Sequence, residues 1–212
     1  MVKEHKATAE RRRTLRLALI GAAERRIAKE GLSALSARAV SKDVGCSLGA
    51  IYNVFDDIDG LVMAVNSKTL ASLDRQIAGA LSAVPEDGNP VDGLVAIGLA
   101  YCRFANAHNQ LWSALFEQGL KADLEVPDWH LDEHVRLFSH ILSYLQKLAP
   151  DQSNEESWML ARLLFSAVHG TVTLGMQGFF IAVPPDEIEK QVSTLITATV
   201  QGLFGADVHD GK

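Results

Sequence analysis

The sequence predicts an all-α protein of about nine helices, for three reasons. Apolar residues recur three and four positions apart along most of the chain, which is helical spacing. Proline is scarce, with 6 in 212 residues, while the good helix formers Ala, Leu, Glu and Arg are frequent. No segment alternates apolar and polar residues as a half-buried strand does. The composition, 48% hydrophobic and 22% charged, is ordinary for a globular chain with a real core.

The first helix is expected over residues 10–29, where Leu19 and Ile27 share one face and Gly31 follows as a stop. Basic residues before its apolar stretch resemble a secretory signal. However, Arg16 interrupts that stretch and no small-residue cleavage site follows, so we interpret it as an amphipathic helix. The sequence has no run of 18 or more apolar residues and therefore predicts no membrane span.

Two short helices, 36–43 and 47–53, are predicted next, on either side of Gly45. Gly45 supplies a left-handed turn residue at low steric cost. The apolar positions allow the two helices to bury a shared core while they cross steeply. These positions are Val40, Val44, Cys46, Ile51 and Val54. Asp57 is then placed to cap a long helix over 58–81.

Five further helices are expected after the loop PEDGNP at 85–90. Ser153 and Glu156 fit a capping box that opens the fourth of them, and Pro185 suits the first turn of the last. The expected ranges are 91–108, 110–120, 129–148, from Ser153 to about 180, and 185–204.

Charge is distributed unevenly along the chain. The net charge is −6, yet residues 1–30 hold nine Lys and Arg against four Asp and Glu, a net +5. Residues 61–212 carry −9. A basic end on an acidic body is expected if only that end meets a polyanion, although a solvated charged helix gives the same count.

The segment LSARAVSKDVGCSLGAIYNVFDDIDGLVMAV resembles the DNA-binding domain of tetracycline-repressor-like (TetR) regulators. The matching features are a small-residue turn, an aliphatic-Tyr-x-x-Phe motif and a long following helix. They fall on Gly45, Ile51, Tyr52, Phe55 and Leu61, and the resemblance covers roughly residues 14–65. A weaker likeness to the ligand-binding half of one subgroup lies in AVHGTVTLGMQG, 167–178.

The resemblance implies a helix-turn-helix DNA-binding domain over 1–57 and a ligand-binding and dimerisation domain over 58–212. It also implies which side chains face bases or phosphates. The DNA-binding set is Arg13, Thr14, Ser36, Arg38, Ser47, Leu48, Gly49, Tyr52 and Asn53. Arg11, Arg12 and Arg16 lie nearby and add charge. For Tyr52, a place in the core with its hydroxyl satisfied is the alternative.

One position departs from the family pattern. Members often carry a Lys that touches phosphate at the start of the fourth helix, where this chain has Ile58 among Asp56, Asp57 and Asp59. The sequence does not decide whether these residues weaken DNA binding. If the position faces DNA, Ile58→Lys should tighten binding and steepen its salt dependence.

The eighth predicted helix is apolar on two sides, so both sides should be buried. One stripe runs through Phe165, Val168 and Val172, and a second through Met159, Leu163, Gly170 and Leu174. The resemblance implies a four-helix dimer interface made by the last two helices. The predicted interface residues are Phe165, Val168, Val172, Val192, Leu195, Ile196, Thr199 and Leu203.

Aromatic and amphipathic residues on the central helices are candidates for a pocket that binds a small, largely apolar effector. They are Tyr101, Phe104, Trp112, Phe116, Phe138, His169 and Met176. Plain core packing is the alternative for each of them.

Metal and cofactor sites are not expected. His130 and His134 are four residues apart on a predicted helix, but no HExxH motif and no nearby thiol accompany them, so a surface pair is the better interpretation. The two cysteines, Cys46 and Cys102, need no bridge and fit a cytoplasmic location. The sequence contains no nucleophile elbow and no phosphate loop, so no motif indicates an enzyme.

The sequence therefore predicts a cytoplasmic, homodimeric regulator that binds double-stranded DNA at a pseudo-palindromic operator. A repressor that a small molecule releases from DNA is the favoured form. The alternative is a helical protein that binds a small molecule or a partner and has a weakened DNA-binding head. The effector, the operator, the regulated genes and the sign of regulation do not follow from the sequence.

Overall fold

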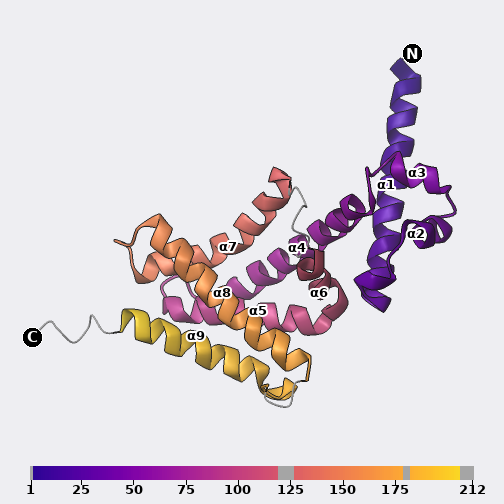
Figure 1. The fold of residues 1–212 in the computed structure, drawn as a ribbon. Coiled ribbons are helices and arrows are strands. Elements are labelled where there is room, and N and C mark those ends of the chain that lie inside the picture. Colours follow the sequence, from indigo (N-terminus) through magenta and orange to yellow (C-terminus); the bar gives the residue numbers. More distant parts are fainter. Residues whose placement is uncertain (1, 119–126, 179–181, 206–212) are drawn as a thin grey trace, which may run out of the picture. The chain divides into compact units, whose positions relative to one another are not determined.

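The computed structural model describes residues 2–118, 127–178 and 182–205, and in these ranges the chain is all-α with no strand. The described residues form nine α-helices, in agreement with the prediction of about nine, and their arrangement is drawn in Figure 1. Their bounds are α1 Val2–Glu30, α2 Ala37–Val44, α3 Leu48–Tyr52, α4 Ile58–Leu81, α5 Pro90–Ala107, α6 Asn109–Gln118, α7 Asp128–Leu148, α8 Asn154–Met176 and α9 Ile188–Phe204. Short 3-10 helices, η1 Leu32–Ala34 and η2 Pro185–Glu187, precede α2 and α9.

Packing divides the chain into two units. The first comprises the described residues up to Ala71 and from His108 to His130, and the second comprises the others. This division differs from the predicted boundary after residue 57. The first part of α4 and all of α6 belong with the first unit, because Leu61, Val65 and Ala114 complete its core.

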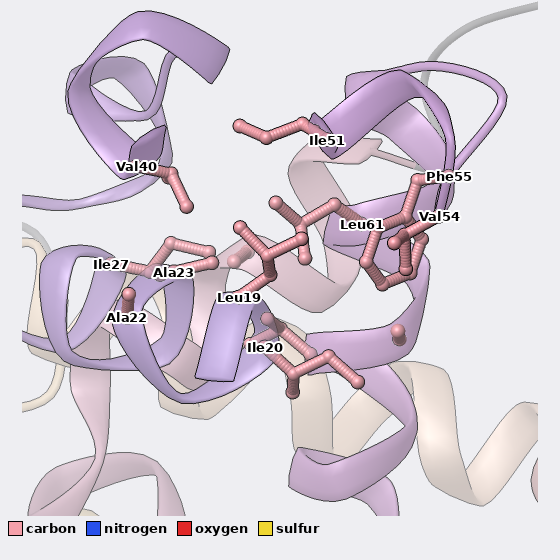
Figure 2. Close-up of a cluster of buried hydrophobic side chains, with 13 residues drawn as sticks. Leu19, Ile20, Ala22, Ala23, Ile27, Val40, Ile51, Val54, Phe55 and Leu61 are labelled. Atoms are coloured by element: carbon pink, nitrogen blue, oxygen red, sulfur yellow. The ribbon is translucent and has the colours of Figure 1, made fainter. Parts of the chain in front are cut away.

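The core of the first unit is built on one face of α1 (Figure 2). Leu19, Ala23 and Ile27 are fully buried there, against Val40 of α2 and Ile51 of α3. Burial of each leucine, isoleucine or valine side chain among them contributes roughly 1.5–3 kcal/mol to folding. We call this core and the helices around it (α1, α2, α3, the start of α4, and α6) the head.

The turn between α2 and α3 has the predicted form. Gly45 adopts φ +73°, and the Cys46 N–H donates to the carbonyl of Ser41 over 3.0 Å, which closes the end of α2. Ser36 and Ser47 cap α2 and α3 by accepting the N–H groups of Ala39 and Ala50. Val44 and Cys46 are only partly buried, at the edge of the core.

The start of α4 explains the residues that depart from the family pattern. The Gly60 N–H donates to Asp57 Oδ1 over 2.7 Å, so Asp57 caps the helix as predicted. Ile58 is partly buried and packs against the core of the head. At the position where family members often carry a lysine, this chain therefore has a residue that packs on the core. The aspartate before it, Asp57, caps the helix.

In the second unit α5, α8 and α9 pack against one another. Val168 and Val172 of α8 and Val192 and Ile196 of α9 are buried. Gly98 lets α5 approach α9 closely, because an added Cβ would lie 2.5 Å from Ile196 Cδ1 and 3.0 Å from Val192 Cγ1.

The start of α8 has the predicted capping box: the Ser153 N–H donates to Glu156 Oε2 over 3.0 Å, and the Glu156 N–H donates to Ser153 Oγ over 3.3 Å. The Ser153 hydroxyl also donates to Glu156 Oε2 over 2.7 Å, and this bond, together with the one from the Ser153 N–H, lowers the pKa of the Glu156 carboxyl. In the described part of the chain, α8 alone has the length and apolarity to cross a membrane, by length and composition only. Val168 and Val172 instead place one of its faces in the protein core.

Replacing Ile58 by Lys should destabilise the head. Part of an apolar side chain leaves the core, so we expect the free energy of unfolding to fall by about 1 kcal/mol, with the long lysine stem limiting the loss. Asp56→Lys is the matched control, because Asp56 is exposed two residues away and its replacement should change stability by less than about 0.5 kcal/mol. Urea unfolding of both variants measures this, and equal effects would contradict the packing role of Ile58.

Gly98→Ala should lower stability although alanine is the better helix former. The added methyl group collides with α9, and overpacking of this kind costs roughly 1–3 kcal/mol. Gly79→Ala in α4 is the control: nothing lies within 4 Å of an added Cβ, so the substitution should stabilise by about 0.5–1 kcal/mol. Thermal unfolding should move the two melting temperatures in opposite directions, and a stabilising Gly98→Ala would contradict the close approach.

Candidate functional site

Every residue of the predicted DNA-binding set is exposed. The set comprises Arg13, Thr14, Ser36, Arg38, Ser47, Leu48, Gly49, Tyr52 and Asn53. Tyr52 is 49% exposed and Leu48 is 40% exposed, although both belong to a helix whose Ile51 is fully buried. The alternative that places Tyr52 in the core is therefore wrong, and α3 presents an amphipathic surface to solvent.

The serines that open α2 and α3 are held in place by their own caps. Ser36 Oγ accepts from the Ala39 N–H over 3.2 Å, and Ser47 Oγ accepts from the Ala50 N–H over 3.3 Å. In each bond the hydroxyl oxygen is the acceptor, so its proton is available to donate to an acceptor such as a phosphate oxygen. The caps thus orient two donors at neighbouring helix starts.

Ion pairs fix the helices around this surface. Arg26 of α1 binds Asp43 of α2 through both carboxylate oxygens, at 2.7–3.0 Å. Lys68 of α4 pairs with Glu24 of α1. The bidentate pair gives α2 a defined rotation on α1. Because each cation has its own carboxylate, both pairs serve the fold.

The second unit contains a cluster of aromatic rings from three helices. We call Tyr101 of α5, Phe138 of α7, and Trp158, Phe165 and His169 of α8 the ring cluster. Phe165 lies at its centre, with ring centroids 5.9 Å from Tyr101, 5.4 Å from Phe138 and 5.5 Å from His169. Trp158 stacks on Phe138 at 5.6 Å. Tyr101 is buried, whereas the other four rings are partly exposed.

A chain of hydrogen bonds crosses the ring cluster. The Tyr101 hydroxyl lies 2.7 Å from His169 Nδ1, and Thr173 Oγ1 lies 3.4 Å from His169 Nε2. Burial lowers the pKa of His169, which favours the neutral ring. A neutral imidazole has one donor and one acceptor nitrogen, and both hydroxyls can adapt to either tautomer. The cluster therefore combines an apolar wall with a polar group that accepts or donates.

The predicted effector residues are divided between the two units. Tyr101, Phe138 and His169 meet in the ring cluster, and Phe104 and Met176 belong to the same unit. Trp112 and Phe116 belong to the first unit, where their ring centroids are 5.4 Å apart. Sequence reasoning missed Trp158 and assigned Phe165 to the dimer interface. Their spacing relative to His169, eleven and four residues, was the available signal for one helix face.

Half of the predicted dimer set is buried in the core of the single chain. Val168, Val172, Val192 and Ile196 are at most 6% exposed there. Leu195 and Thr199 are partly exposed and Leu203 is exposed. The second predicted stripe is the exposed one. We call Met159, Leu163 and Leu174, at 63%, 52% and 51% exposure, the exposed stripe of α8.

The histidine pair on α7 also differs from expectation. His130 is buried, with Nδ1 3.5 Å from Ser67 Oγ and its ring 5.4 Å from that of Trp129, while His134 is exposed. The two are therefore not a surface pair. In the described ranges no three His, Cys, Asp or Glu side chains are grouped to hold a metal ion. Cys46 and Cys102 are free thiols, and burial raises the pKa of Cys102 to about 12.

Solved structures share this fold. A protein of unknown function from Rhodococcus sp. RHA1 has a TM-score of 0.70 at 22% identity, covering 87% of this chain and 94% of that one. A TetR transcriptional regulator from the same organism has a TM-score of 0.60 at 18% identity, covering 90% and 96%. A TetR-family transcriptional regulator from Streptomyces coelicolor has a TM-score of 0.66 at 20% identity, covering 93% and 86%.

No protein with curated annotation matches the sequence. A family model, described as the C-terminal domain of tetracycline-repressor-like proteins, matches residues 94–199. This match lies in the half of the chain that the helix-turn-helix resemblance does not cover. The chain belongs to the TetR family of transcriptional regulators.

Proposed function

We propose that this TetR-family regulator is a cytoplasmic homodimer that binds a pseudo-palindromic operator and acts as a repressor, released by a small, largely apolar molecule. The observation that carries the proposal is the exposed face of α3 on the well-packed head. Tyr52 and Leu48 remain in solvent although the same helix buries Ile51. A short helix with an apolar and a polar side chain exposed together suits the major groove, where thymine methyl groups and phosphates lie close to each other.

The sites of the two serine caps and Tyr52 suit contacts with the DNA backbone. Hydroxyl groups at Ser36, Ser47 and Tyr52 each have a proton to donate to phosphate. Such contacts position a protein on the duplex, whereas base edges specify the sequence. Leu48, Gly49 and Asn53 lie on the exposed surface of the α3 region and are our candidates for the base-facing role.

The exposed stripe of α8 supports a homodimer. Its three large apolar side chains lie along one face of α8, spaced four and eleven residues apart, and Leu203 of α9 is 44% exposed. Exposed apolar side chains in a row are typical of association surfaces. A two-fold dimer presents two heads to the two halves of a palindrome.

The ring cluster supports an aromatic or otherwise apolar effector. Four partly exposed rings offer stacking surfaces, and the Tyr101–His169 bond offers one polar partner. Release from DNA follows by population shift if the effector binds more tightly to the dimer whose heads are wrongly spaced for the operator.

The alternative is a ligand-binding protein with a weakened DNA-binding head, and Ile58 and the neighbouring aspartates motivate it. Ile58 packs on the core of the head and Asp57 caps α4, so both residues also have structural roles. Ligand-dependent thermal stabilisation together with only sequence-blind DNA binding would favour this alternative.

Selection of bound sequences from random DNA tests the DNA-binding function. We expect a pseudo-palindrome whose half-sites lie one helical turn apart, about 34 Å, or a little more. Tyr52→Phe should then weaken binding about fivefold per head on every duplex, because each lost hydroxyl-to-phosphate bond is worth about 1 kcal/mol. Its fold should be intact, since Tyr52 is exposed. Tyr144→Phe in α7 is the control and should bind as the wild type does. Failure to enrich any sequence at low salt would overturn the proposed function.

Leu163→Glu should disrupt the dimer. A carboxylate placed in an apolar interface is costly to desolvate, so we expect the dissociation constant of the dimer, measured by analytical ultracentrifugation, to increase at least tenfold. Leu131→Glu is the matched control, because Leu131 of α7 is 48% exposed and Leu163 is 52% exposed. Both variants should fold, since neither residue is buried in the single chain. Identical masses for wild type, Leu163→Glu and Leu131→Glu would contradict the interface.

A further inference from the structure

The first helix is longer than the head requires. It begins at Val2, whereas its fully buried residues begin at Leu19, and residues 6–14 are all exposed. Figure 1 shows α1 continuing past α2 and α3 toward the N-terminus. Isolated helical segments are marginal in water, so more than two turns of exposed helix without apolar support need another reason.

The face of α1 that forms the core continues outward as arginine. Arg12, Arg16, Leu19, Ala23 and Ile27 follow at steps of four, three, four and four residues, which is one stripe of a helix. The inner three are 0% exposed, and the outer two are exposed. On this stripe of α1, the residues that precede the buried core toward the N-terminus are therefore arginines.

Arg16 has a fixed place at the edge of the head. Its guanidinium carbon lies 4.4 Å from the centroid of the Phe55 ring, a cation–π contact. Phe55 follows Tyr52 by three residues and is buried, directly before the capped start of α4. The contact thus places a guanidinium beside the corner that joins α3 to α4.

Neither Arg12 nor Arg16 forms an ion pair with a described residue, although three aspartates follow Phe55. Arg26 of the same helix shows the contrast, because Asp43 binds it through both oxygens. Because neither cation is held by a carboxylate of the fold, both are available to pair with an anion from outside the head.

We propose that Arg12 and Arg16 form a phosphate-binding ridge on α1 that contacts the backbone of the duplex held by α3. The proposal rests on the proposed function. The ridge supplies the cationic contact that Ile58 does not provide, from a different helix. The ridge also changes which residues of α1 are expected to contact phosphate. Thr14 is two positions from Arg12 and from Arg16, so it lies roughly 200° around the helix from both, on the far face. Arg12 and Arg16 replace Arg13 and Thr14 as the principal contacts of α1.

The test compares the salt dependence of DNA binding for wild type, Arg12→Gln, and the double variant Arg12→Gln with Arg16→Gln. Binding is measured by fluorescence anisotropy on a labelled random-sequence duplex and on the selected site. Each lost phosphate contact should reduce the slope of log K against log salt by about 0.9, so the double variant should lose about 2 per head. Affinity should fall at least about tenfold at low salt on both duplexes, and the gap should narrow as salt is raised.

Arg25→Gln is the matched control. Arg25 is exposed on the same helix, without an ion pair, but six positions from Leu19 and therefore away from the stripe. It should leave the slope unchanged. Circular dichroism melting checks the fold, and Arg12→Gln keeps the test valid if loss of the Phe55 contact destabilises the double variant.

The outcomes separate the ridge from the proposed function. Slopes that are equal in wild type, both arginine variants and Arg25→Gln would overturn the ridge, even if specific binding is retained. A wild type that selects no sequence, but whose slope on the random duplex falls with Arg12 and Arg16, would overturn the operator-binding function and support the ridge.

Discussion

Burial of one face of α1 is the interaction on which the head depends. Leu19, Ala23 and Ile27 provide the surface against which α2, α3, the start of α4 and α6 pack. Neither α2, with 8 residues, nor α3, with 5, is long enough to be stable as an isolated helix. Their orientation is therefore a consequence of the α1 surface, and so is the exposure of Tyr52 and Leu48 beside the buried Ile51 on α3.

Charge is used in two distinct ways around that core. Arg26 and Lys68 pair with carboxylates on neighbouring helices and hold the helices in register. Arg12 and Arg16 lie on the extension of the buried stripe and have no such partner among the described residues. A net charge of +5 over residues 1–30 hides this difference, because it counts paired and unpaired cations alike. Only the unpaired ones are available to a polyanion without breaking a contact of the fold.

Local chemistry made much of the fold predictable. Gly45, the serine caps and Asp57 act through bonds to residues within five positions, so their patterns can be recognised in sequence. Residues whose role depends on distant neighbours were less predictable. Ile58 matched a motif position for a phosphate contact but packs on the core, and His130 is covered by a residue 63 positions away. The two stripes of α8 were both recognised, yet their periodicity could not tell which one faces the core, because each is equally helical.

In the proposed mechanism, α8 takes part in both effector binding and dimer formation, because it carries part of the ring cluster and also the exposed stripe. Trp158, Phe165 and His169 lie on one side of it, and the exposed stripe lies roughly 130° around the axis. A ligand that displaced Phe165 would disturb its contacts with rings from both α5 and α7. Packed side chains respond to such a change by shifting the helix as a body, because close-packed interiors do not deform continuously. A rotation of α8 would change the angle of the exposed stripe, and hence the geometry of a dimer interface built on it.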